Sequence, residues 1–113
     1  MAIEGEWPKR SEVESVWRRM LVGDLTREAA HDWAKPWVEG ADVGTPTDAM
    51  ASLGLDYLHG LDMTASPASP NLIYHGGAEP YVLSELEVAA RLDYWLVRCR
   101  EYDSLYDRPP ADG

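Results

Sequence analysis

Two Ser-x-x-Glu segments, each followed by apolar residues at helical spacing, constrain the fold more than any other feature of this sequence. They are Ser11–Glu14 and Ser84–Glu87. In such a capping box the Ser hydroxyl and the Glu carboxylate accept hydrogen bonds from backbone N–H groups near the helix start. Both segments therefore predict helix starts, one near each end of the chain, and favour a mainly α-helical fold.

The first helix is predicted over residues 11–22. Its apolar residues recur at i, i+3, i+4, i+7 and i+8, which is the spacing of one helix face. They are Val13, Val16, Trp17, Met20 and Leu21. Gly23 follows the last of them and predicts the helix end.

The second helix is predicted over residues 27–38, with Thr26 as its cap. Pro36 is expected to kink or end it near Lys35, because proline lacks the backbone N–H. Its expected stripe is Ala29, Ala30, Trp33 and Trp37. The short connection predicts a closely packed helix pair in which Trp17, Trp33 and Trp37 meet in one cluster.

Two further helices are predicted over residues 46–59 and 85–102. Pro46 suits the first position of the third helix. The fourth helix is the longest, and its sequence is expected to become irregular from Asp103. Its expected buried stripe is Val88, Leu92, Trp95, Cys99 and Tyr102.

A small β-hairpin is predicted near residues 72–83, where two short apolar runs flank Gly76-Gly77. The segment 64–70, rich in Ser, Ala and Pro, is expected to be a loop. The expected fold is therefore mainly α, with about four helices and a small hairpin. We expect one domain over residues 1–113, with flexible ends at 1–10 and 104–113.

Residues 36–90 contain no Lys or Arg, although the whole chain carries ten of them. The acids in this stretch are Glu39, Asp42, Asp48, Asp56, Asp62, Glu79, Glu85 and Glu87. With a formal net charge of −10, the chain is expected to repel nucleic acid and anionic membranes and to attract basic proteins.

A cytoplasmic location is expected from the sequence. Cys99 is the single cysteine, which excludes an internal disulfide and a multi-cysteine metal site. No stretch of 18 apolar residues is present, and no charged segment with an apolar run opens the chain.

Catalytic motifs are absent, so we expect no cofactor and no enzymatic activity. Cys99 lies on a predicted buried stripe, and Ser84 is explained as a helix cap. His59 lies between Asp56 and Asp62 on the third helix, and a metal site of His59, Asp62 and His75 would form if the hairpin folded over that helix. Surface histidines explain the same pattern.

The segment Trp17-Arg18-Arg19-Met20-Leu21-Val22-Gly23-Asp24-Leu25-Thr26-Arg27-Glu28, followed by Trp33 and Trp37, resembles small acidic bacterial proteins of the immunity type, which neutralise a cognate toxin. The run Leu58-His59-Gly60-Leu61-Asp62 before a long Trp-bearing helix adds to the resemblance. It implies a non-enzymatic protein that binds one basic, nuclease-like toxin domain tightly.

Three hypotheses follow from the sequence. The first is an acidic inhibitor of a basic partner, the second an adaptor that dimerises through aromatic residues, and the third a small metal-dependent enzyme using His59 and His75. The sequence leaves open whether the chain is a monomer or a homodimer. For the first hypothesis the expected contact residues are Glu39, Asp42, Asp48, Asp56, Tyr57, Asp62, Tyr74, Glu79 and Tyr81.

Overall fold

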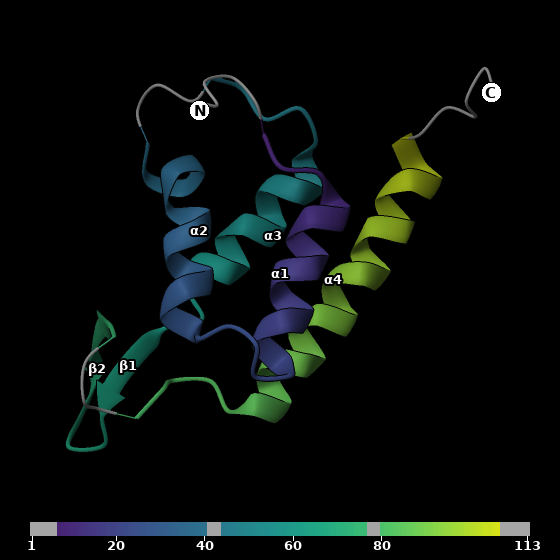
Figure 1. The fold of residues 1–113 in the computed structure, drawn as a ribbon. Helices are drawn as coiled ribbons and strands as arrows, with labels where there is room; N and C mark the ends of the chain where they lie inside the picture. The colour runs from purple at the N-terminus through teal and green to yellow at the C-terminus, as the bar shows by residue number, and fades with distance from the viewer. Residues whose placement is uncertain (1–6, 41–43, 77–79, 107–113) are drawn as a thin grey trace.

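The computed structural model describes residues 7–40, 44–76 and 80–106. The expected fold class, mainly α with a small antiparallel hairpin, is confirmed (Figure 1). In chain order the elements are α1 (Arg10–Leu21), α2 (Arg27–Glu39), α3 (Ala49–His59), β1 (Met63–Ser66), β2 (Ser69–His75) and α4 (Glu85–Tyr106). The hairpin lies at one end of the helical body, beside the start of α2.

The capping box at the start of α4 is confirmed. The Ser84 hydroxyl accepts a hydrogen bond from the Glu87 N–H (3.1 Å), and the Glu87 carboxylate accepts one from the Ser84 N–H (2.8 Å). These contacts hold the pKa of Glu87 below its usual value. The helix start was therefore set by local sequence alone.

The capping box predicted at Ser11–Glu14 is wrong, because α1 begins earlier, at Arg10. The carboxylate that accepts from the cap residue is that of Glu12, which bonds the Lys9 N–H at 2.8 Å. Glu14 instead pairs with Arg18 one turn along the helix, at 2.7 Å.

Two other helix boundaries differ from prediction. α2 ends at Glu39, one residue beyond the predicted range of 27–38, and it continues through Pro36, where a kink or an end near Lys35 was expected. Pro36 lies in the last turn, where its missing N–H removes one helix hydrogen bond while its carbonyl still accepts from Gly40 at 3.0 Å. α3 begins at Ala49 rather than at Pro46, because the Asp48 carboxylate caps it.

The core is built around two fully buried tryptophans, Trp17 of α1 and Trp95 of α4, whose rings stack with centroids 5.6 Å apart. Trp33 and Trp37 contact each other one turn apart and pack against the same hydrophobic core as Trp17, whose stacking partner is Trp95. The indole N–H of Trp95 donates to the Met50 carbonyl at 2.8 Å, and that of Trp17 donates to the Val88 carbonyl at 3.3 Å. Each ring is thus buried without an unpaired donor.

α3 approaches this stack closely because it carries a glycine there. A Cβ atom on Gly54 would lie 2.7 Å from Val13 Cγ1 and 2.8 Å from Trp95 Cζ2. Gly54 therefore costs helix propensity but permits the contact between α3 and the tryptophan layer.

The predicted buried stripe of α4 is confirmed: Val88, Leu92, Trp95 and Cys99 are buried, and Tyr102 is half-buried. The helix runs beyond its predicted end to Tyr106. Arg10 binds the Asp103 carboxylate at 2.9 Å, which ties the last turns of α4 to α1. In the described ranges no helix combines the length and apolar character needed to cross a bilayer.

The hairpin differs from prediction in its strands. β1 lies in the segment expected to be a loop, and it pairs with β2 so that Thr64 faces Tyr74 across a turn at Pro67-Ala68. Tyr81 pairs with the other edge of β1, again opposite Thr64. The two apolar runs therefore flank β1 instead of pairing with each other across Gly76.

Candidate functional site

One of the predicted contact residues, Asp48, forms an ion pair within the fold. Asp48 lies at the start of α3, where it accepts hydrogen bonds from Arg10 at 2.6 and 3.1 Å. Although partial burial acts to raise it, the Arg10 guanidinium holds the pKa of Asp48 below its usual value. This acid is neutralised by a cation from outside the acidic stretch.

Two further predicted contact residues are withdrawn from solvent. Asp62 is 3% exposed, and Tyr57 is half-buried with its ring 5.6 Å from that of Trp17. Asp56 is exposed, and partial desolvation by neighbouring atoms raises its pKa. Asp42 and Glu79 lie outside the described residues.

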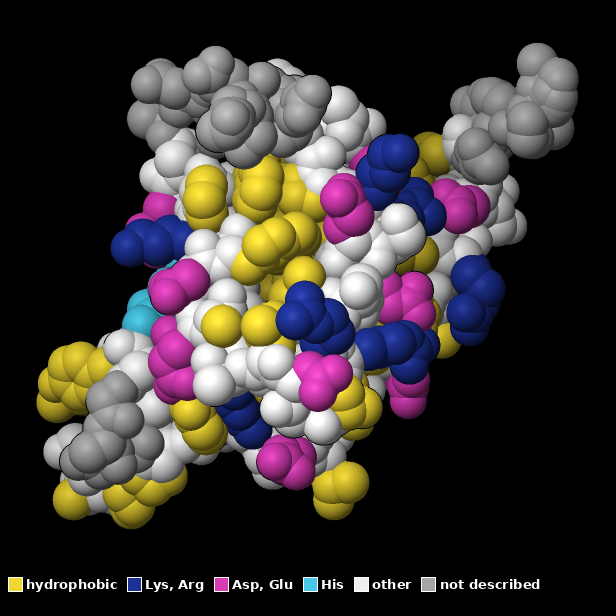
Figure 2. Space-filling view, in the orientation of Figure 1, with side chains coloured by type: hydrophobic (Ala, Val, Ile, Leu, Met, Phe, Trp, Pro, Cys, Tyr) yellow, Lys and Arg dark blue, Asp and Glu magenta, His cyan; other side chains and the backbone are white. Residues whose placement is uncertain are grey.

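The hairpin end of the molecule exposes a group of large apolar side chains. They are Leu72, Ile73, Tyr74, Tyr81 and Val82, hereafter the hairpin surface, and each is between 42% and 57% exposed. Figure 2 shows apolar side chains at the lower left, the position of the hairpin in Figure 1. Two of the predicted contact residues, Tyr74 and Tyr81, belong to it.

Tyr74 and Tyr81 stand on the same face of the small sheet. Both are paired directly opposite Thr64, one on each side of β1, and directly opposed residues of antiparallel strands point to one face. Thr64 itself is 1% exposed, so the two tyrosines flank a buried position.

Tyr81 is held in place by two residues of α2. Its hydroxyl donates to the Glu28 carboxylate at 2.8 Å, and this contact raises the pKa of Tyr81. The Arg27 guanidinium lies 4.1 Å from the centroid of the tyrosine ring. Arg27 is 8% exposed and donates to the carbonyls of Leu83 (2.7 Å) and Leu61 (3.3 Å), so this cation is used within the fold.

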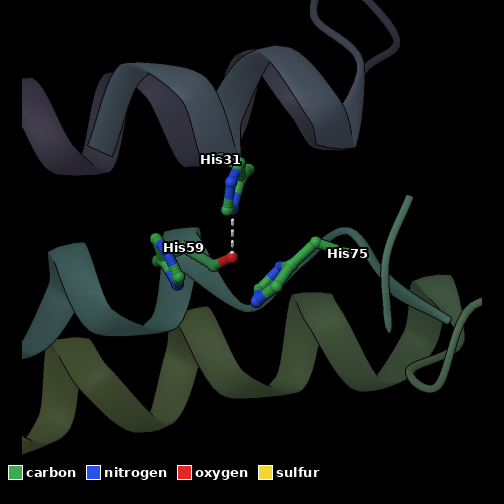
Figure 3. Close-up of side chains that lie close together, drawn as sticks. All are labelled: His31, His59 and His75. Atoms are coloured by element: carbon green, nitrogen blue, oxygen red, sulfur yellow. Dashed lines mark hydrogen bonds between the residues drawn. The ribbon is translucent and has the colours of Figure 1, made fainter. Parts of the chain in front are cut away.

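A cluster of three histidines lies beside the hairpin. His31 comes from the middle of α2, His59 is the last residue of α3, and His75 is the last residue of β2. Their ring centroids are 4.3 to 4.8 Å apart in pairs. Figure 3 shows the three rings gathered in the space between these elements.

Each ring of the histidine cluster has a hydrogen-bond acceptor at one nitrogen. His31 Nδ1 donates to the His59 carbonyl at 2.7 Å, and His75 Nδ1 lies 2.6 Å from Asp62 Oδ1. His59 Nε2 lies 2.5 Å from Glu39 Oε2, and this bond holds the pKa of Glu39 below its usual value. Because carbonyls and carboxylates accept, these nitrogens carry the protons.

Asp62 lies beneath the cluster in the connection between α3 and β1. Its Oδ1 is also 3.4 Å from His31 Nδ1, so one buried carboxylate oxygen serves two imidazoles. Its backbone carbonyl accepts from the Gly76 N–H at 2.7 Å. Asp62 therefore fixes the end of β2 next to α2 and α3.

The sequence analysis named three of these four residues as a possible metal site, His59, Asp62 and His75, and did not include His31. His59, Asp62 and His75 meet, as expected if the hairpin folded over α3. The sequence analysis left His31 out because the buried residues of α2 share only Ala30 with the predicted stripe; they are Arg27, Ala30, His31 and Ala34. These residues follow the helical spacing i, i+3, i+4 and i+7. Because two of them, Arg27 and His31, are polar, the spacing did not indicate a buried helix face.

Cys99 shows no sign of a reactive thiol. It is 7% exposed, and burial raises its pKa, which keeps the thiol protonated.

Comparisons with known protein families, with curated proteins and with solved structures find no match to this chain.

Proposed function

We propose that the chain is a non-enzymatic binding protein that takes up a basic protein partner on its hairpin surface, in the manner of an immunity protein or inhibitor. The observation that carries this proposal is the exposure of large apolar side chains on the small sheet. Leu72, Tyr74 and Tyr81 lie on one face, Ile73 is exposed on the other, and Val82 follows Tyr81. Isolated exposed apolar residues are ordinary, whereas a group of this kind is typical of an interaction site.

The apolar side chains supply the affinity in this proposal. Burying a fully exposed Leu or Ile side chain contributes about 1.5–3 kcal/mol before the costs of association, and Leu72 and Ile73 still expose about half of their surface. Tyrosine is frequent among residues that dominate interface energetics. Tyr81 is already held by Glu28, so it loses little side-chain freedom on binding.

The charge of the chain favours a basic partner over a second copy. A net charge of −10 on each copy opposes self-association, while the same charge accelerates encounter with a cationic protein. The hairpin surface lies within residues 36–90, which supply no Lys or Arg to repel such a partner.

The test is co-expression with the proteins encoded beside this gene, followed by binding measurements at low and high salt. We expect a basic protein to bind, and its affinity to fall as salt increases. Tyr74→Ala is expected to weaken binding by more than about tenfold. Tyr94→Ala is the matched control, because Tyr94 on α4 is 56% exposed against 57% for Tyr74.

Equal effects of the two substitutions would place the contact elsewhere and overturn the proposal. Concentration-dependent dimers in place of a complex, measured by sedimentation, would favour the adaptor hypothesis instead.

A further inference from the structure

We propose that His31, His59 and His75 form a binding site for one divalent transition-metal ion such as zinc. This site is independent of the partner-binding function, because it uses the histidine cluster rather than the hairpin surface. The sequence contains three histidines in all, and the fold brings all three together from separate elements.

The ring nitrogens are close to metal-binding geometry. One nitrogen from each of the three rings lies within 4.8 Å of the others. Ligand nitrogens on a tetrahedral zinc ion, at Zn–N distances of about 2.0–2.1 Å, are about 3.3 Å apart. The rings therefore need to close by about 1.5 Å at most, which small rotations of side chains at element ends provide.

Two of the three proposed ligands are the last residues of secondary-structure elements. His59 closes α3 and His75 closes β2, where Gly76 follows with a φ of +75°. Positive φ is readily adopted by glycine, so the chain can turn away directly after His75. His31 lies within α2 and points from that helix toward the other two rings (Figure 3).

The hydrogen bonds around the cluster suit metal ligation. Each imidazole has two nitrogens, so one can coordinate while the other donates its proton. The acceptors are Asp62 for His75, Glu39 for His59 and the His59 carbonyl for His31. Carboxylate and carbonyl acceptors of this kind orient metal-ligating histidines in proteins.

The buried carboxylate of Asp62, which contacts two of the rings, is a second observation that favours a cation at the cluster. Asp62 is 3% exposed, and within the described residues its recorded ion-pair partners are His31 and His75, with no Lys or Arg. A buried carboxylate requires a compensating positive charge. A divalent ion among the three imidazoles would supply that charge, with Glu39 adding a second carboxylate at the rim.

The donor set selects the class of metal. Imidazole nitrogens suit Zn²⁺, Co²⁺, Ni²⁺ and Cu²⁺, whereas Mg²⁺ and Ca²⁺ require oxygen ligands. Three protein ligands leave a fourth tetrahedral position for water. We therefore expect one zinc ion per chain with three nitrogen ligands and one exchangeable ligand.

The experiment uses untagged, chelator-treated protein titrated with ZnCl₂ by calorimetry and with CoCl₂ by visible absorption. We expect one ion per chain, a tetrahedral Co²⁺ spectrum, a higher melting temperature with Zn²⁺ and no response to MgCl₂. His75→Ala is the main variant, because this side chain is 42% exposed and lies outside the hydrophobic core cluster. It is expected to weaken zinc binding by at least about tenfold.

Asp93→Asn is the matched control, since it removes an exposed carboxylate on α4 and is expected to bind zinc as the unaltered chain does. Equal zinc affinity in His75→Ala and the unaltered chain would overturn the proposal. So would an octahedral Co²⁺ spectrum, or calorimetry that detects no binding in the unaltered chain.

Discussion

His75 Nδ1 lies 2.6 Å from Asp62 Oδ1, and this contact joins the end of β2 to the connection between α3 and β1. The carboxylate is buried, while the imidazole is 42% exposed. The hairpin is thus attached to the helical body through a charged acceptor at its base. Neutralising that acceptor tests how much the attachment contributes to stability.

Asp62→Asn is expected to lower the free energy of unfolding by about 1–1.5 kcal/mol, because hydrogen bonds to a charged group are replaced by weaker ones at a buried position. The measurement is urea unfolding followed by tryptophan fluorescence. Asp93→Asn makes the same chemical change on an exposed side chain and is expected to stay within about 0.5 kcal/mol of the unaltered chain. Similar losses in both variants would show that Asp62 is not a stabilising acceptor.

Gly54→Ala is expected to destabilise the chain although alanine is the better helix former by about 1 kcal/mol. The added methyl would lie within 3 Å of Val13 and Trp95, and overpacking of this kind costs about 1–3 kcal/mol. Ser52→Ala, a half-buried site in the same helix, serves as the control and is expected to be neutral or slightly stabilising. Urea unfolding distinguishes the outcomes, and a stabilised Gly54→Ala chain would contradict the predicted clash.

The sequence predicted those elements that local chemistry determines. The start of α4 follows from Ser84 and Glu87 alone, and its buried stripe follows from apolar spacing. β1 was missed because Met63–Ser66 contains one β-branched residue, Thr64, and becomes a strand by pairing on both edges. Such pairing depends on tertiary contacts, which local sequence patterns do not reveal.

The candidate site also combines residues that lie near one another in the sequence with a residue that only tertiary packing brings to them. His59, Asp62 and His75 are close in sequence, so one assumption about the hairpin brought them together. His31 required knowledge of how α2 packs against α3, the most extensive packing between helices in the described chain. The pairing of Asp48 with Arg10 likewise spans 38 residues, and no local pattern reveals that this acid is neutralised.

The Asp48–Arg10 pair predicts a loss of stability in acid. The folded-state pKa of Asp48 lies below its unfolded value of about 3.9, so the stabilisation is complete above that value and disappears as pH falls through the folded pKa. Asp48→Asn keeps a good N-cap residue but removes the charge. We expect this variant to be less stable than the unaltered chain near neutral pH and to lose less stability below about pH 4. Urea unfolding across this range tests it, and parallel pH curves would contradict the prediction.

Zinc is expected to slow hydrogen exchange along β2, because the proposed metal joins His75 to α2 and α3 and so restricts opening of the hairpin. Exchange is measured by mass spectrometry with ZnCl₂ and with chelator. Peptides covering Leu72–His75 are expected to gain protection, whereas peptides from the second half of α4 are expected to change little. His75→Ala should remove the zinc effect while keeping the exchange of α4 unchanged. Zinc that binds with one ion per chain but leaves β2 exchange unaltered would show that the ion is held without restraining the hairpin.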